Sequence, residues 1–250
     1  MNNFKKVLKI IGVSLLWLAV WQAAAMLINQ EILLPTPLKT IESLFVLGKT
    51  ADFYASVLIS LLRIVLGYIL GVVFGILGGI ASNKWHTFDI IFSPIIKIIK
   101  AVPVASFIIL ALVWFHAKTL PVFIVFLMVL PMIWSSVQTG LQTINPKYLE
   151  MAKIYNLSRF KTFFKIKVPF IMPALVSTAL TALGFAWKSG IAAEVICRPE
   201  NSIGDKLQSA KLTIETPEVF ALTAIVALLS ILLEAGIKKI AKEYLNDKSK

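Results

Sequence analysis

The chain has 250 residues, of which 58% are hydrophobic and only 15% are charged. This balance is typical of a protein that crosses a membrane several times, and it excludes an ordinary soluble domain. The net charge of +12 is scattered between apolar segments, which argues against a nucleic-acid-binding patch, and a single cysteine excludes a disulfide framework. We therefore expect an all-α polytopic membrane protein that forms one transmembrane domain over residues 1–250.

Two membrane-spanning helices are expected in the first third of the chain, and the first covers about 7–28. Its apolar stretch is too long for the apolar region of a cleaved signal peptide. In the polar segment 29–55, Gly48-Lys49-Thr50 lacks both the earlier glycine and the preceding strand of a phosphate-binding loop. We therefore expect neither ATP nor another cofactor on this chain.

The second span covers about 56–81 and carries a stripe of glycines. Gly67, Gly71, Gly75 and Gly79 recur every four residues, so they share one helix face and allow a neighbouring helix to approach closely. We expect this face to serve helix packing. The alternative is a surface that shifts between two transport states.

The third span, about 88–115, contains two prolines. Pro94 and Pro103 are expected to break it into a short helix over 88–102, near the cytoplasmic interface, and a membrane helix after it. The fourth span covers about 121–140.

A polar and basic segment, 141–170, separates the fourth and fifth spans. Asn145 followed by Pro146 is typical of a helix start, and Asn156 tolerates the left-handed backbone conformation that ends a helix. A second short helix is expected to run until Pro169 stops it. The segment is therefore predicted to form two short helices with a corner between them.

Seven residues of this segment form a spaced motif, namely Glu150, Met151, Ala152, Asn156, Ile166, Val168 and Pro169. The spacing resembles the EAA loop of bacterial ABC-importer permeases, which has E-A-A, three residues, G, nine residues and I-x-L-P. Met151, Asn156 and Val168 depart from that pattern. In the family this loop docks into a groove on the ATPase subunit, so the resemblance implies that the same residues couple this chain to an ATPase.

The fifth span, about 171–196, contains Lys188, Gly190 and Glu194. Ionisable groups inside a membrane are costly, which makes them candidates for function. We expect Lys188 to be the counter-charge of Glu194, if Gly190 permits a bend, or of another acid; the alternative is that Lys188 attracts an anionic substrate. In either case the fifth helix is expected to line the translocation path. Arg63 of the second span either extends to the membrane surface or pairs with a carboxylate.

The sixth span covers about 218–240, and the basic residues between the spans predict the orientation. With a cytoplasmic N-terminus, the outer segments hold only Lys39, Lys49, Lys118, Arg198, Lys206 and Lys211. All other basic residues outside the spans then lie inside. Both termini and the segment 141–170 are therefore predicted to be cytoplasmic.

Further motifs extend the resemblance over residues 34–196. They are Leu34-Pro35-Thr36-Pro37, Ser60-Leu61-Leu62-Arg63 with Gly67 and Gly71, Pro94, Pro103, and Ala192-Ala193-Glu194. These motifs are similar to the nitrate/sulfonate/taurine branch of the importer permeases, whose substrates are small anions. The resemblance implies the six-helix type I importer permease fold in a bacterial cell membrane.

The same resemblance implies partners. It predicts two ABC ATPase subunits, an extracytoplasmic substrate-binding protein and a homodimer of the permease, with a heterodimer with a paralogue as the alternative. The mechanism it implies is alternating access driven by ATP, with no covalent chemistry on this chain.

Two other classes remain open from the residues alone. A secondary transporter or channel would need coupling ions and usually an inverted repeat, and neither a repeat nor a series of membrane carboxylates is visible. A membrane-embedded enzyme would need clustered catalytic groups, whereas His86 and His116 fall at span ends without paired ligands.

Overall fold

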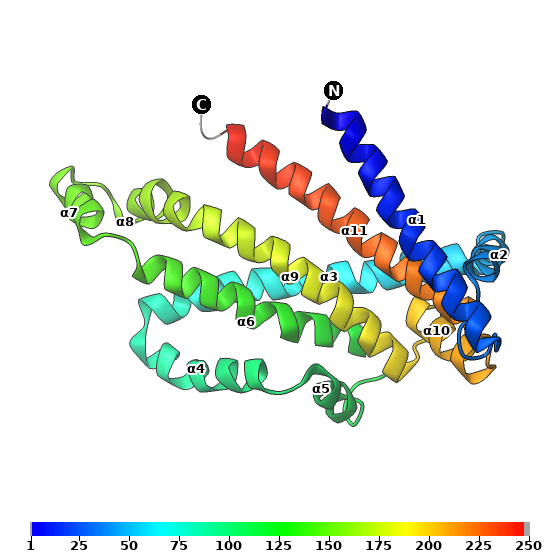
Figure 1. The fold of residues 1–250 in the computed structure, drawn as a ribbon. Coiled ribbons are helices and arrows are strands. Elements are labelled where there is room, and N and C mark those ends of the chain that lie inside the picture. Colours follow the sequence, from blue (N-terminus) through cyan, green and yellow to red (C-terminus); the bar gives the residue numbers. More distant parts are fainter. Residues whose placement is uncertain (1, 248–250) are drawn as a thin grey trace.

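The computed structural model describes residues 2–247 and is built from helices (Figure 1). In chain order these are α1 (Asn2–Ile28), α2 (Pro37–Leu47), α3 (Ala51–Lys84), α4 (His86–Ala101), α5 (Val104–Ala111), α6 (Leu120–Gln142), α7 (Pro146–Ile154), α8 (Arg159–Thr162), the π-helical turn η1 (Phe163–Lys167), α9 (Val168–Cys197), α10 (Ile203–Leu212) and α11 (Thr216–Asp247). Within the described residues no strand forms, which confirms the all-α prediction.

Five helical stretches among residues 2–247 are long and apolar enough to cross a membrane. They lie in α1, α3, α6, α11 and the run from α8 through α9. A sixth crossing is present if α4 and α5, which are bent by 107° relative to each other, count as one broken span. The chain is therefore a multi-pass membrane protein with five or six crossings.

The centre of the molecule is the contact between α3 and α6. A Cβ placed on Gly71 would lie 2.7 Å from Cβ of Val129, and one on Gly75 would lie 2.8 Å from Cβ of Ile133. Both distances are too short for a real side chain, so the backbones of the two helices meet where α3 has no side chain. Gly67 and Gly79 approach carbonyl oxygens of α6 in the same way. The glycine stripe is a packing surface in this structure.

A complementary stripe on α6 receives these glycines, and sequence reasoning missed it. Val125, Val129, Ile133 and Val137 also recur every four residues, and all four are fully buried. Branched side chains with few rotamers fill the space beside each glycine at little entropic cost. The matching four-residue period on both helices could have been noticed in the sequence.

Helix α9 closes the core against α3 and α6. The Tyr68 hydroxyl donates a hydrogen bond to the Ala179 carbonyl oxygen over 2.9 Å, and the indole of the buried Trp187 donates to the Val226 carbonyl oxygen of α11 over 3.0 Å. Backbone carbonyls that accept from neighbouring helices in this way fix the rotation of α9.

The third span differs from its prediction. Pro94 does not break the chain, because α4 continues through it, and α4 lies lengthwise beside α6 (Figure 1). The chain turns only at Pro103, where the extended Val102 (φ −81°, ψ 131°) has the conformation that a following proline favours. The membrane helix expected after this point is the eight-residue α5, which is too short to cross a membrane.

The elements gather at two ends of the bundle. The first turn of α1, the last turn of α11 and the short helix α7 lie toward one end, while α2, α5 and α10 lie toward the other (Figure 1). The two ends therefore differ in composition, with the basic 141–170 segment at the end that holds the first turn of α1 and the last turn of α11.

Candidate functional site

Helix α7 is defined by its caps. The Asn145 side chain accepts a hydrogen bond from the Lys147 N–H over 3.0 Å, and Pro146 occupies the first turn, where no N–H is needed. At the other end Asn156 has φ 50°, and the Leu157 N–H bonds back to the Ala152 carbonyl over 2.9 Å. This is the hydrogen-bond pattern of a glycine-type helix end, which asparagine also adopts.

The two faces of α7 differ in burial. Ala152 is 2% exposed and lines a groove of about 680 Å³ between α7, α8, η1 and the C-terminal end of α3. Glu150 and Met151 are exposed, and Ile154 and Tyr155 are 78% and 72% exposed. Large apolar side chains at the tip of a segment that extends beyond the bundle indicate a surface for a protein partner.

Beyond the corner, the Ser158 side chain caps α8, but Pro169 does not stop the helix. The chain passes from α8 through the π-helical turn η1 into α9, and Pro169 lies in the first turn of α9. In the π-turn the Val168 N–H bonds to the Phe163 carbonyl. The π-turn shifts the backbone hydrogen bonds directly before Pro169, which has no N–H to donate, and helical structure continues from the corner through η1 into α9.

The expected pairing of Lys188 with Glu194 is wrong. Glu194 is fully buried, accepts a hydrogen bond from the Ser60 hydroxyl over 2.6 Å and lies 3.5 Å from Nη1 of Arg63. Lys188 is exposed on another face of α9. The two residues are six positions apart, which turns them about 120° from each other on a straight helix.

Gly190 also has a different role from the expected one. α9 is helical through this position, and a Cβ on Gly190 would lie 2.5 Å from Cγ1 of Ile64. Gly190 therefore permits close contact between α9 and α3. It does not bend α9, so Lys188 and Glu194 stay on separate faces of the helix.

The buried carboxylate joins three helices. The Ser60 hydroxyl that donates to Glu194 also accepts the Ile203 N–H over 2.9 Å, and the Gly204 N–H points to the same carboxylate at 3.4 Å. These N–H groups open α10, where negative charge is favoured. Arg63 further donates to the Glu200 carbonyl over 3.2 Å. We call Ser60, Arg63, Glu194 and the start of α10 the outer lock.

The close approach in the outer lock requires a glycine. A Cβ on Gly204 would lie 2.3 Å from Cβ of Glu194. The sequence leaves two options for the Arg63 side chain, which either extends to the membrane surface or pairs with a carboxylate. The structure shows that it pairs with a carboxylate. The sequence assigns no role to Ser60 or Gly204, because their contacts with Glu194 form only when α3, α9 and α10 pack together.

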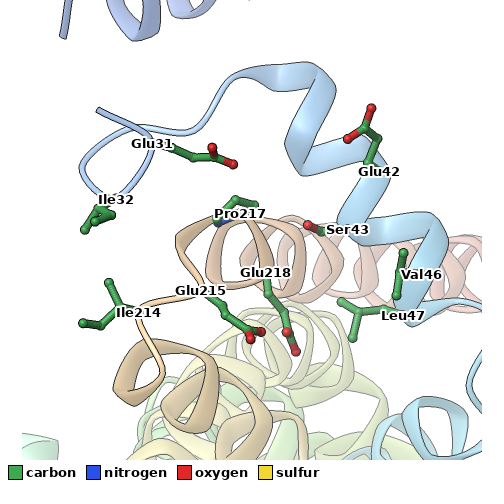
Figure 2. A pocket seen from close by; sticks show the side chains of 10 residues that line it. All are labelled: Glu31, Ile32, Glu42, Ser43, Val46, Leu47, Ile214, Glu215, Pro217 and Glu218. Carbon is green, nitrogen blue, oxygen red and sulfur yellow. The ribbon is translucent and has the colours of Figure 1, made fainter. Parts of the chain in front are cut away.

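A second groove, of about 580 Å³, lies at the α2 and α10 end. Figure 2 shows Glu31, Glu42, Glu215 and Glu218 around it, from the α1–α2 turn, α2, the α10–α11 connection and the first turn of α11. Glu31 pairs with Lys39 on α2. This groove is remote from α7 and contains none of the residues that the sequence singled out.

Comparisons with solved structures identify the class of fold. The permease chain of a bacterial alginate ABC transporter, solved in complex with an alginate pentasaccharide-bound periplasmic protein, superposes with a TM-score of 0.66 at 11% identity, over 97% of this chain and 96% of that one. A chain of an amino acid ABC transporter gives a TM-score of 0.62 at 13% identity, over 77% of this chain and 92% of that one. The fold is that of the type I ABC importer permeases.

The sequence then identifies the family. Residues 67–243 match the family described as the binding-protein-dependent transport system inner membrane component, and the chain belongs to it. It is therefore a permease subunit of an ABC importer in the cell membrane, which favours this class over a secondary transporter or channel.

Three named relatives share low identity with the chain. It is 27% identical to the taurine transport system permease protein TauC of Escherichia coli (strain K12), over 89% of this chain and 82% of the relative. It is 26% identical to the putative aliphatic sulfonates transport permease protein SsuC of the same organism, over 91% and 87%. It is also 26% identical to the nitrate import permease protein NrtB of Leptolyngbya laminosa, over 63% and 56%.

Proposed function

We propose that this chain is the translocating subunit of an ATP-driven importer that carries a small anion delivered by an extracytoplasmic binding protein. The names of the relatives support the substrate class, since taurine, aliphatic sulfonates and nitrate each carry a negatively charged oxygen-bearing group. The alginate transporter, solved with a periplasmic protein, supports the binding protein as a partner.

The observation that carries the proposal is the α7 end. Its tip exposes Met151, Ile154 and Tyr155, and it is followed by helical structure that continues into α9. An ATPase that grips this tip can move α9 with it, because a continuous helix transmits displacement along its axis. In this proposal Glu150 and Met151 contact the ATPase, Ala152 and Asn156 shape α7, and Ile166 and Pro169 join the tip to α9.

The translocation path in this proposal follows the exposed side of α9. Ser177, Thr181 and Lys188 lie within about 40° of one another on that helix, from its rotation of about 100° per residue. All three are exposed. A second copy of the chain, related by two-fold symmetry, would close this side and supply the second α7 that a pair of ATPase subunits requires.

The orientation follows from the same arrangement. α7 and both chain termini face the cytoplasm, and the α2 and α10 end faces the binding protein. The basic residues around α7 agree with this orientation, since positive charge in short loops favours the cytoplasmic side.

The test compares two exposed apolar residues at opposite ends. Ile154→Ser removes an apolar side chain from the tip of α7, and Leu33→Ser does the same in the α1–α2 turn, where Leu33 is 64% exposed. Each permease variant is co-expressed with its ATPase. We expect Ile154→Ser to reduce the amount of co-purified ATPase about tenfold, the loss of one interface anchor of roughly 1.4 kcal/mol.

Leu33→Ser is the control for a general effect of removing an exposed apolar side chain. Leu33→Ser should co-purify the ATPase at the normal level, and both variants should accumulate in the membrane. Normal ATPase recovery with Ile154→Ser, or equal loss with both variants, would contradict the assignment of α7 as the coupling helix.

A further inference from the structure

A chain of polar side chains crosses three membrane helices at one level. The Lys100 ammonium of α4 donates to the Ser135 hydroxyl of α6 over 2.5 Å, and the Thr178 hydroxyl of α9 donates to Ser136 over 3.0 Å. Because Ser135 and Ser136 are adjacent on α6, these contacts join α4, α6 and α9 side by side (Figure 1).

The lysines of this region form no described ion pair, although Glu234 of α11, which pairs with Lys238, lies next to α9 at Gly184, one turn from Lys188. Among the described residues, α4, α6 and α9 carry two acids: Asp89, which accepts from Gln138, and Glu194, which belongs to the outer lock. No ion pair within 4.0 Å involves Lys97, Lys100 or Lys188 in the described part of the chain. An unpaired charge at this depth is costly in lipid, so it should face water or an anion.

The positive charges occupy two levels of the same side. Thr178 and Lys188 are ten residues apart on α9, which is about 15 Å along the helix axis. Lys188 lies toward the outer end of α9, and Lys100 with the hydroxyls of Ser135, Ser136 and Thr178 lies toward the inner end. On α6, Ser135 and the exposed Thr139 are one turn apart and share this side.

We propose that Lys100, together with the hydroxyls of Ser135, Ser136 and Thr178, forms an inner binding station for the oxyanion group of the transported solute. This inference rests on the proposed function and adds a site deeper in the path than Lys188. The station takes a singly charged oxyanion such as a sulfonate or nitrate, because an ammonium and hydroxyl groups all donate hydrogen bonds to oxygen.

The chemistry of the station suits an anion that binds weakly and moves on better than one that is held tightly. A lysine ammonium is a flexible point charge that does not impose the bidentate geometry of arginine. Conduction needs binding that is favourable enough for entry and weak enough for exit. Two levels of positive charge about 15 Å apart allow an anion to leave the outer one and still be attracted by the inner one.

The experiment measures the local electrostatic preference directly. The single cysteine, Cys197, is changed to Ser, and Thr139→Cys adds a reporter thiol one turn from Ser135. Membranes that contain this permease are treated with 2-sulfonatoethyl methanethiosulfonate, an anion, and separately with the trimethylammonioethyl reagent, a cation. The ratio of the two modification rates reports the charge that the reagents meet.

We expect Lys100→Met to lower the anion-to-cation rate ratio about tenfold, the low end of what a charged cleft contributes to association rates. Lys97→Met is the matched control, because Lys97 lies one turn away on α4, is exposed, and makes no hydrogen bond to α6 among the described contacts. It should change the ratio by less than about threefold, since Lys100 and not Lys97 contacts Ser135. Lys100→Gln, which loses the charge but keeps a donor for Ser135, should behave as Lys100→Met and serves if the methionine variant fails to accumulate.

An unchanged ratio in both Lys100 variants would overturn the inner station, and so would equal effects of Lys97→Met and Lys100→Met. The measurement needs neither the ATPase nor the binding protein. Its failure is therefore distinct from failure of the proposed function, which is tested by ATPase recovery with Ile154→Ser.

Discussion

Two sets of charged side chains lie within the membrane-crossing helices, and their surroundings are opposite. In the outer lock, Glu194 is fully buried and is surrounded by a serine hydroxyl, an arginine and the N–H groups of α10. On α4 and α9, Lys100 contacts the Ser135 hydroxyl, Lys188 is exposed, and neither lysine has a described acid within 4.0 Å. The comparison separates a charge that is compensated inside the fold from charges without a described acidic partner.

The largest expected effect comes from breaking the lock. Glu194→Ala leaves Arg63 facing an emptied site and removes the acceptor of the Ser60 hydroxyl, a change that costs about 3–5 kcal/mol for a buried pair. We expect a large loss of folded permease, measured by size-exclusion chromatography in detergent and by thermal unfolding. Glu200→Ala is the control, because the Glu200 side chain is exposed and pairs only at the surface with Lys118.

A double variant tests whether charge compensation explains that loss. Arg63→Met combined with Glu194→Leu replaces the pair by apolar groups of similar volume, an exchange that is often neutral. Most of the lost stability should return. A double variant no more stable than Glu194→Ala would show that the lock is not held by compensation of these two charges.

A smaller effect is expected from the hydroxyl that joins the lock. Ser60→Ala leaves the Ile203 N–H without a partner and removes the shortest hydrogen bond to Glu194, whose Oε2 keeps only the Gly204 N–H at 3.4 Å, at a cost of about 1–3 kcal/mol. Ser56→Ala is the matched control, because Ser56 is equally buried one turn earlier on α3 but bonds only to the Asp52 carbonyl of its own helix. Equal thermal stability of the two variants would contradict the bridging role of Ser60.

The smallest effect on stability is expected on the exposed side. The free energy of unfolding of Lys188→Met should lie within about 0.5 kcal/mol of that of the unchanged protein, as is usual for surface substitutions. Uptake of a small anion into proteoliposomes that hold the complete transporter should nevertheless fall several-fold, because the path loses a positive charge. Lys118→Met, in an exposed outer loop, should alter neither quantity. Normal uptake by Lys188→Met would remove this lysine from the path.

Local features were determined by the sequence itself. The caps of α7 follow from Asn145, Pro146 and Asn156, since capping uses neighbouring side chains and backbone conformation alone. The glycine stripe of α3 likewise predicts close packing, because its four-residue period defines one face whatever helix lies opposite. The class of protein followed from composition and from the spacing of the motif around Glu150.

Only the tertiary structure decided how distant segments combine. The choice of Arg63 over Lys188 as the partner of Glu194 depends on which face of α9 meets α3, and residues 131 positions apart carry no local mark of that contact. The continuation of the helix through Pro169 depends on a π-turn, which is compatible with proline but cannot be predicted from it. The direction of α4 depends on its packing along α6, because an amphipathic helix with lysines suits either a membrane surface or a polar path until its neighbours are in place.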